Sequence, residues 1–229
     1  MPSDTPAAPP ARDRRWSQWS DDGVARLAGA RYRLGRGEPA VALTFDDGPD
    51  PEFTPLVLDA LASAGARATF FVLGRHAETY PDLVRRAHAE GHRIGTHSQT
   101  HPKAAGAHHR LLIDDYRAGR ASVQDILGVP VPLFRPPHGR ITPAVAMAVR
   151  RLSLDVWLWT VNTDDWRSGT TPQGLLDQLD EVSAGDVVVF HDATAEQRPG
   201  VSTDRSATIE ALAGVVDLVR TRGMTFATL

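Results

Sequence analysis

Two adjacent carboxylates at the end of an apolar run are the first residues whose spacing suggests chemistry. Residues 44–49 read TFDDGP, in which Gly48 and Pro49 interrupt any regular strand. Adjacent side chains on a strand face opposite ways, but this break lets Asp46 and Asp47 turn toward one centre. Keeping two carboxylates so close both charged costs electrostatic free energy. If one of them bound a metal ion, the other would be left as a base. An ordinary Asp-Gly-Pro turn is the alternative.

A pair of histidines, His97 and His101, forms the second candidate within residues 97–102, which read HSQTHP. Histidines four apart can reach one metal across a single turn, and Pro102 limits any helix that follows. The chain has nine histidines and no cysteine. A metal would therefore be held by His, Asp or Glu, and chance spacing is the alternative for this pair.

Three further segments place polar groups after apolar runs. In residues 134–139 (FRPPHG), Arg135 could hold a charged group, and the stiff Pro-Pro-His-Gly turn could expose a backbone N–H that stabilises an oxyanion. An ordinary surface loop is the alternative. Residues 157–166 (WLWTVNTDDW) are aromatic, and their tryptophans are expected in the core except Trp166, which lies past the strand end. His191 ends a fully apolar run, which suits proton transfer, with a satisfied core histidine as the alternative.

The elements that must position these residues alternate along the chain. Short apolar runs separated by amphipathic stretches predict parallel strands joined by helices. Strands are predicted at 40–46, 67–73, 92–97, 131–135, 155–162, 186–191 and 224–228. Helices are predicted at 55–64, 77–90, 110–127, 143–152, 172–183 and 206–222. Seven strands fit either a doubly wound sheet or an incomplete barrel.

The polar residues decide between these two folds. Five of them fall at the C-terminal ends of five different predicted strands: Asp46, His97, Arg135, Asn162 and His191. A β/α barrel gathers its active site from several strand ends, whereas an open sheet concentrates it at one switch point. We therefore predict an α/β fold, a distorted and incomplete (β/α) barrel of about seven parallel strands.

Local signals place the ends of the helices. Threonine followed by proline predicts an N-cap and a first turn at Thr54-Pro55, Thr142-Pro143 and Thr171-Pro172. Four glycines fall where helices should stop before the next strand: Gly65, Gly91, Gly128 and Gly223.

Composition limits the function classes. The formal net charge of −3 provides no basic field for nucleic acid or anionic lipid, and no apolar run is long enough to span a membrane. Residues 1–21 are predicted to form a flexible Pro/Ala-rich arm, and residues 22–229 one catalytic domain, expected to be a monomer. Because no signal peptide is evident, the chain is expected in the cytoplasm, or in the cell envelope or medium if an export signal is missing from it.

In order along the chain, the segments TFDDGP, HSQTH, FRPPHG, NTDDW and VVFHD resemble the motifs of the NodB-homology polysaccharide deacetylases, carbohydrate esterase family four. The resemblance covers about residues 40–229. That family includes chitin, chitooligosaccharide, peptidoglycan and acetylxylan deacetylases. The resemblance implies a distorted β/α barrel and one divalent metal ion, zinc or alternatively cobalt.

Carried over by position, the resemblance implies that Asp47, His97 and His101 bind the metal. Asp46 is then the general base that takes a proton from the metal-activated water, and His191 the general acid that protonates the leaving amine.

The resemblance also implies supporting residues. Arg135 would orient Asp46, and Asp165 is placed with the catalytic residues. The expected substrate-binding residues are Pro136, His138, Gly139, Asn162, Trp166 and Val189. Among these, a backbone N–H near His138 would stabilise the oxyanion, and Trp166 and Val189 would line the acetyl pocket.

Two positions depart from the family pattern. Asn162 stands where the family usually has Asp, and His138 where it usually has Tyr. We expect Asn162 to lie near His191 and, being neutral, to leave the pKa of His191 lower than in relatives, unless Asp165 supplies the charge.

The expected function is removal of acetyl groups from N-acetylglucosamine-containing oligo- or polysaccharides, of the chitooligosaccharide or peptidoglycan type. An acetylxylan O-deacetylase and a non-catalytic carbohydrate-binding relative are the alternatives. A different barrel metalloenzyme, such as a sugar isomerase, would need more carboxylate ligands and a second metal.

Overall fold

The computed structural model describes residues 22–35, 37 and 39–229. The predicted flexible arm, residues 1–21, lies outside the described residues, and the domain assignment stays a prediction. No helix among the described residues is long and apolar enough to cross a membrane.

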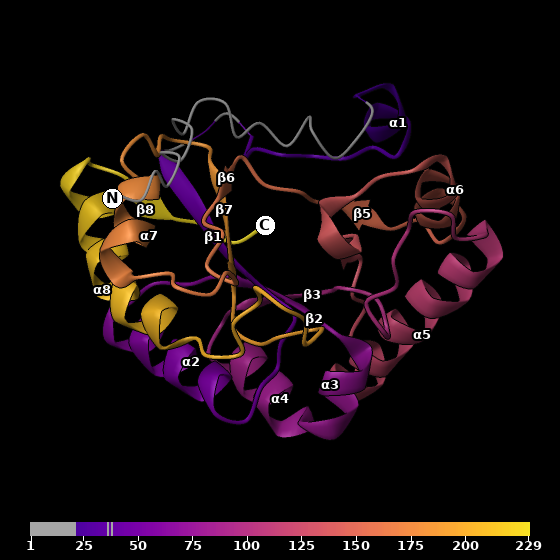
Figure 1. The fold of residues 1–229 in the computed structure, drawn as a ribbon, viewed down its shortest axis with the longest axis horizontal. Helices are drawn as coiled ribbons and strands as arrows, with labels where there is room; N and C mark the ends of the chain where they lie inside the picture. Colours follow the sequence, from indigo (N-terminus) through magenta and orange to yellow (C-terminus); the bar gives the residue numbers. More distant parts are fainter. Residues whose placement is uncertain (1–21, 36, 38) are drawn as a thin grey trace, which may run out of the picture.

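A curved sheet of parallel strands forms the centre of the molecule, with helices around its outside (Figure 1). The strands are β1 Ala40–Asp46, β2 Thr69–Val72, β3 Arg93–Thr96, β4 Leu133–Phe134, β5 Asp155–Val156, β6 Val161–Asn162, β7 Val187–His191 and β8 Thr225–Phe226. Seven of them follow the order β5-β4-β3-β2-β1-β7-β6, and β8 pairs with β1 off this path. The sheet curls into a half-barrel, which confirms the predicted incomplete (β/α) barrel.

The single strand predicted at 155–162 is wrong, because the chain there forms two strands on opposite edges of the sheet. β5 pairs with β4, whereas β6 pairs with β7. Between them, residues 157–160 cross from one edge to the other, and the N–H of Thr160 already donates to the carbonyl of Val187 at 2.9 Å. A continuous apolar run carries no signal for a change of neighbouring strand, so the sequence pattern could not show this crossing.

The helices are α1 Asp22–Leu27, α2 Phe53–Ser63, α3 Gly74–Thr79, α4 Pro81–Ala89, α5 His109–Leu127, α6 Pro143–Arg151, α7 Pro172–Gln178 and α8 Ser206–Thr221, with a 3₁₀ turn η3 at Pro137–Gly139. The helix predicted at 77–90 is wrong as one unit, since α3 and α4 replace it. Tyr80 between them has φ −128° and ψ 58°. The following Pro81 disfavours a helical conformation at Tyr80, so one helix ends and another begins.

Two of the three predicted threonine caps are confirmed. Thr142 accepts a hydrogen bond from the N–H of Val145, and Thr171 accepts one from the N–H of Gly174. Each helix then continues from a proline in its first turn.

The predicted cap at Thr54 is wrong, because α2 begins at Phe53 and Thr54 lies inside it. The side chain of Asp50 accepts hydrogen bonds from the N–H groups of Glu52 and Phe53 at 2.8 and 3.0 Å, which fixes an earlier start. The hydroxyl of Thr54 is thereby free to donate to Asp192.

Glycines end the helices as predicted. All four adopt a left-handed backbone, with φ between 56° and 85° at Gly65, Gly91, Gly128 and Gly223. At Gly128 the value is 67°, and its N–H closes α5 by donating to the carbonyl of Gln124 at 2.7 Å. A side chain at this position would be strained by the positive φ.

The core beneath the strands holds the strand ends in place. Phe45 of β1 stacks on Phe70 of β2 and on Phe190 of β7, with ring centroids 5.1 and 5.7 Å apart. These three rings are neighbours in register across the parallel ladder. Each buried ring contributes roughly 1.5–3 kcal/mol. Their packing fixes the position of the next residue on each strand, including Asp46 and His191.

Candidate metal centre and active site

Three residues from two strand ends come together as a candidate metal site. Ligand atoms of Asp47, His97 and His101 all lie within 4.8 Å of one another. The Oδ1 atom of Asp47 is 3.6 Å from the Nε2 atom of each histidine, and it accepts no hydrogen bond from the described residues. Four ligands arranged tetrahedrally about 2.1 Å from a zinc ion lie about 3.4 Å apart. The donor atoms and their spacing therefore fit a divalent cation.

The backbone explains how these side chains reach one point. Asp47 and His101 have φ of 75° and 62°, and Ser98 has φ of 80°, all in the left-handed region. Such a conformation is uncommon outside glycine and costs of order 1 kcal/mol or more at each residue. At Asp47 it breaks the alternation of β1, so both adjacent carboxylates face the same centre, as the TFDDGP pattern predicts.

The loop that carries His101 is held from α5. Ser98 Oγ accepts a hydrogen bond from the N–H of His101 at 3.0 Å, and the Asp115 carboxylate accepts one from Gln99 N–H at 3.0 Å. A Cβ atom on Gly119 would lie 2.4 Å from the carbonyl carbon of Ser98, so only glycine lets α5 approach this loop. Sequence reasoning missed Asp115 and Gly119, because neither belongs to a motif.

Hydrogen bonds also orient the first histidine and the aspartate. His97 Nδ1 is 2.7 Å from the carbonyl of Arg135, which can only accept, so Nδ1 carries the proton and Nε2 faces the site. His76 Nδ1 contacts the carbonyl of Asp47 at 2.7 Å, a role its sequence position did not reveal. Burial favours a raised pKa for Asp47, but the nearby His101, His191 and His97 lower it to about 2. The carboxylate is therefore anionic at any working pH.

Asp46 pairs with a fully buried arginine. Arg135 Nη1 donates to Asp46 Oδ1 at 2.7 Å and to the hydroxyl of Thr44 at 2.8 Å. Its other nitrogens donate to the carbonyls of Trp157 and Leu158, so the buried guanidinium is well satisfied. The residue lies behind the site and acts on it through Asp46.

The second oxygen of Asp46 faces the metal site, 3.9 Å from His97 Nε2. Burial raises the pKa of Asp46 to about 6, against the lowering influence of Arg135 and His191. The group is therefore poised to exchange a proton near neutral pH.

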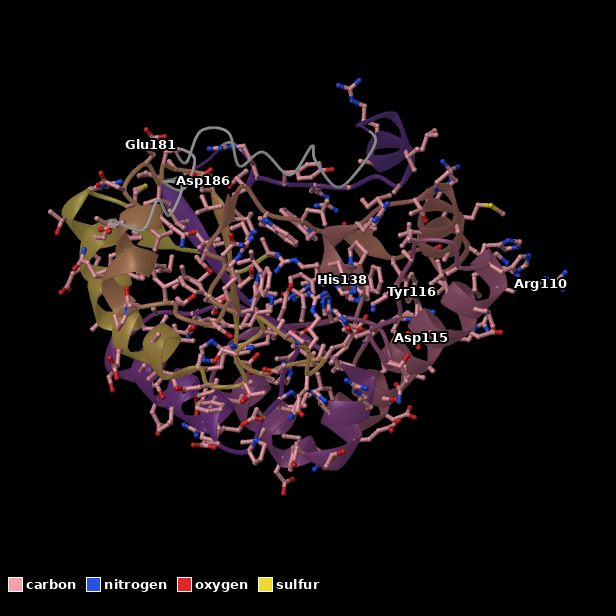
Figure 2. All side chains as sticks on the ribbon, viewed as in Figure 1. Arg110, Asp115, Tyr116, His138, Glu181 and Asp186 are labelled. Carbon is pink, nitrogen blue, oxygen red and sulfur yellow. The ribbon has the colours of Figure 1, made fainter. Side chains whose placement is uncertain are left out.

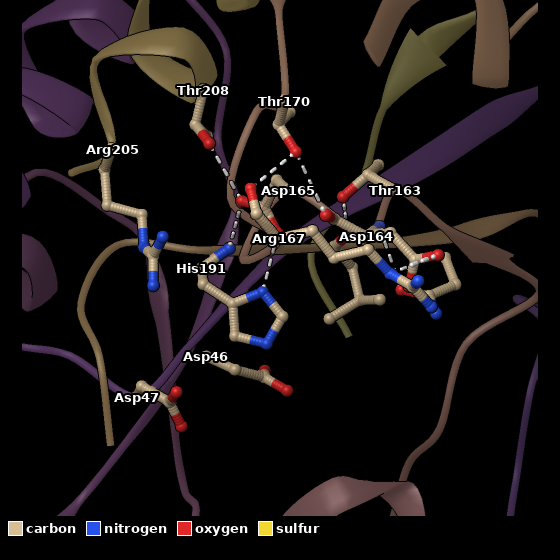
Figure 3. A network of polar contacts seen from close by, with 12 residues as sticks. Asp46, Asp47, Thr163, Asp164, Asp165, Arg167, Thr170, His191, Arg205 and Thr208 are labelled. Carbon is tan, nitrogen blue, oxygen red and sulfur yellow. Dashed lines mark hydrogen bonds and ion pairs between the residues drawn. The ribbon is translucent and has the colours of Figure 1, made fainter. Parts of the chain in front are cut away.

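His191 forms a tight pair with Asp165 (Figure 3). Its Nδ1 is 2.7 Å from Asp165 Oδ1, and its backbone N–H donates to Asp165 Oδ2 at 2.8 Å. Thr208 of α8 donates to the same oxygen at 2.9 Å. Burial favours a lower pKa for His191, but Asp165, with Asp47 and Asp46, raises it to about 9. The ring is therefore an imidazolium at neutral pH.

The expectation that Asn162 leaves the pKa of His191 low is wrong, because Asp165 raises this pKa to about 9. Asn162 instead hydrogen-bonds Asp164, whose carboxylate accepts from the amide at 2.8 Å. Asp164 has φ of 51°, and this turn carries the chain back so that Asp165 meets the end of β7. The alternative that Asp165 supplies the charge is the one the structure bears out.

A cavity of about 850 Å³ opens over these groups. Of the expected substrate-binding residues, five line it: His138, Gly139, Asn162, Trp166 and Val189. Pro136 is buried and is not part of the lining, so its role stays a prediction. A Cβ atom on Gly139 would lie 2.3 Å from the Trp159 ring, which explains the glycine in FRPPHG. Trp157 is buried, as expected for a core tryptophan.

A third buried carboxyl, Asp192, supports the turn after β1 and was missed by sequence reasoning. Thr54 donates to its Oδ2 atom at 2.6 Å, and burial raises the pKa of Asp192 to about 7. A Cβ atom on Gly48 would lie 2.3 Å from the same carboxyl group, so the turn passes directly over it. No spacing signal distinguishes this residue from an ordinary aspartate after a strand.

A half-barrel whose strand ends carry a His-His-Asp cation site, an Arg-paired carboxylate and an Asp-paired histidine has the architecture of a metal-dependent hydrolase. The family model described as polysaccharide deacetylase matches residues 34–157. The chain belongs to this family, carbohydrate esterase family 4, and is a carbohydrate deacetylase of it, as its motifs predict.

Relatives of this chain align with most of its length. A peptidoglycan-N-acetylglucosamine deacetylase of Bacillus cereus is 33% identical over 200 residues, which are 86% of this chain and 90% of the relative. A chitooligosaccharide deacetylase of Sinorhizobium fredii is 36% identical over 200 residues, 83% of this chain and 90% of the relative. The solved structure of the Bc1960 peptidoglycan N-acetylglucosamine deacetylase has a TM-score of 0.82 at 29% identity, covering 92% of this chain and 95% of that one.

Proposed function

We propose that this protein removes N-acetyl groups from N-acetylglucosamine-containing oligo- or polysaccharides of the peptidoglycan or chitooligosaccharide type. The observation that carries the proposal is the pair of titratable groups beside the cation site. The pKa of Asp46 is raised to about 6 and that of His191 to about 9. Between these values one group is an ionised base and the other a protonated acid, which is the division of labour that amide hydrolysis requires.

We infer that the cation held by Asp47, His97 and His101 is zinc, with cobalt as a substitute, because two histidines and one carboxylate form an open zinc site. A cation bound there supplies Lewis acidity that polarises the acetyl carbonyl and makes water a stronger nucleophile at neutral pH.

The chain's own residues handle the protons. Asp46, with one oxygen held by Arg135, accepts a proton from the attacking water through its other oxygen. His191 lines the cavity with its Nδ1 held by Asp165 (Figure 3), and its Nε2 donates its proton to the departing amine nitrogen. The water oxygen becomes part of acetate, the carbon–nitrogen bond breaks, and the sugar keeps a free amine.

The substrate class is supported by the cavity and by the named relatives. The cavity offers an aromatic face at Trp166, an apolar wall at Val189 and polar groups at Asn162 and His138, which together suit a sugar with an acetyl group. Similarity to both peptidoglycan and chitooligosaccharide deacetylases supports N-acetylglucosamine as the acetylated unit.

Acetate release from the metal-loaded protein tests the proposal. N-acetylglucosamine oligomers, peptidoglycan and acetylxylan should be assayed in parallel, with metal content measured in each preparation. We expect release from one or both N-acetylated substrates. Release from acetylxylan alone would favour the O-deacetylase alternative, and binding without any release would favour a carbohydrate-binding protein.

A further inference from the structure

A second group of candidate ligands lies beside the first and shares His101 with it. Ligand atoms of His101, His138 and Glu196 all lie within 4.8 Å of one another. All three residues line the same 850 Å³ cavity. Figure 2 shows His138 near the middle of the view, whereas Arg110 and Glu181 lie at its outline.

The two edges of the His101 ring face different ligand groups. Its Nε2 atom is 3.6 Å from Asp47 Oδ1, whereas its Nδ1 atom is 3.8 Å from Glu196 Oε1. His101 is 7% exposed, and its Nδ1 atom has no hydrogen-bond partner among the described residues. Nε2 of His138 is likewise buried and unpartnered there. The rings of His101 and His138 meet edge to face, with centroids 4.4 Å apart.

The unpartnered nitrogens are unusual for this site. A metal-binding histidine almost always donates its other N–H to a carbonyl or carboxylate, as His97 does to the Arg135 carbonyl at 2.7 Å. At 3.8 Å, Glu196 is too far from His101 to play that part. Two histidine nitrogens and a carboxylate that all lie within 4.8 Å of one another have instead the types and spacing of ligands around a cation.

We propose that His101, His138 and Glu196 bind a second divalent cation of the zinc or copper(II) class, with the His101 ring bridging the two sites. The inference goes beyond the proposed deacetylation and shares only His101 with it. When both sites are filled, the ring gives up its remaining proton to solvent, so the second cation binds more weakly than the first. Lys103, whose Nζ is 3.9 Å from Glu196 Oε2, is largely exposed and can turn away.

A cation at this second site inhibits the enzyme. It occupies the cavity over the first site, where the acetylated sugar has to enter. Excess zinc should therefore lower deacetylation at concentrations above those that load the first site.

Metal stoichiometry tests the proposal without any substrate. Zinc binding is measured on the full chain by calorimetry and by equilibrium dialysis with metal analysis. The exposed His108 and the adjacent His109, whose rings lie 4.3 Å apart, form a competing surface pair. All titrations therefore use the His108→Asn/His109→Ala background, in which asparagine preserves the cap of α5.

In that background the parent should bind two zinc ions per chain, while His138→Tyr and Glu196→Gln each bind one. Loading with copper(II) should give an exchange-coupled pair, so that the electron paramagnetic resonance signal per copper is weaker in the parent than in Glu196→Gln. Excess zinc should inhibit each variant less than the parent, each measured against its own uninhibited rate.

Two results would overturn the second site. One is a single zinc ion per chain in the parent, and the other is a second ion that persists in both variants. Loss of the first ion in His97→Ala concerns the first site alone, so failure of the proposed function and failure of this inference give different results.

Discussion

The pair formed by Asp165 and His191 offers the sharpest test of the proposed chemistry, and Asp165→Asn is the change that probes it. Asparagine keeps the size of the side chain and can still accept a hydrogen bond from the ring, but it removes the negative charge beside Nδ1. Burial then remains the main influence, and burial lowers the pKa of His191. We expect this pKa to fall from about 9 to near its ordinary value of 6.5.

The magnitude follows from these two pKa values, whose difference corresponds to roughly 3 kcal/mol of stabilisation of the imidazolium. At pH 8 a ring with the higher pKa is about nine-tenths protonated, and one with the lower pKa about 3% protonated. Because the acid must carry its proton, kcat/KM should fall about thirtyfold at pH 8. At pH 6 both rings are largely protonated, and the two enzymes should differ by less than about twofold.

The assay is the pH profile of kcat/KM on an N-acetylglucosamine oligomer, with NMR titration of the His191 ring in the same proteins. Asn162→Asp is the matched control, because Asn162 contacts Asp164 and not His191, so its alkaline limb should stay in place. An equal loss at pH 6 and pH 8 in Asp165→Asn, with the alkaline limb unmoved, would refute the reasoning. Asp165 would then only position the ring.

The same pair makes the stability of the fold depend on pH. The folded pKa of His191 is raised above its unfolded value, so the stabilisation is complete below about pH 6.5 and is lost as the pH rises through about 9. The free-energy difference of unfolding between parent and Asp165→Asn should therefore shrink by roughly 3 kcal/mol between pH 6 and pH 10. Urea denaturation at a series of pH values measures it, and a difference that does not change with pH would contradict the assignment.

Three further predictions concern the metal centre. Chelation should abolish deacetylation and zinc or cobalt should restore it, while His97→Ala lowers metal content and activity together; full activity of a demonstrably metal-free protein would contradict this. Asp46→Asn should keep the metal but lose turnover by roughly 10²- to 10⁴-fold, whereas Asp47→Asn should weaken metal binding itself, and the reverse pattern in metal analysis would exchange their roles. Gly119→Ala should place a Cβ atom 2.4 Å from the Ser98 backbone, lowering the free energy of unfolding by roughly 1–3 kcal/mol and the metal affinity. An unchanged urea midpoint with unchanged metal binding would show that α5 does not hold this loop.

Much of the site could be predicted because its chemistry depends on residue type and order. Asp46 and His191 end buried strands and His97 follows one, and parallel strands bring their C-terminal ends to one edge of the sheet. The curvature of the sheet was predictable for the same reason, since five strand ends contribute to one centre. These conclusions follow from two features of the sequence. Apolar runs alternate with amphipathic stretches, and a polar residue ends or follows five of these runs.

The remaining features depend on contacts between segments that the sequence keeps apart. The crossing at 157–160 is invisible in an apolar run, and the error at Asn162 came from ignoring the left-handed turn at Asp164. Gly119 matters only because α5 approaches the His101 loop, and His76 only because its ring reaches a carbonyl on another element. No local pattern encodes either contact.

The different roles of the two adjacent aspartates follow from where the backbone sends each side chain. Asp46 is the last residue of β1, in register with His191, and its side chain meets the buried charge of Arg135. Asp47 leaves the strand in a left-handed conformation and meets histidines instead. A metal ligand has to stay ionised throughout the cycle, which a pKa of about 2 ensures for Asp47. A base has to gain and then lose a proton near neutral pH, and this requires the raised pKa of about 6 at Asp46. In the proposed mechanism, one turn after one strand thus makes a permanent ligand and a reversible base from identical neighbouring side chains.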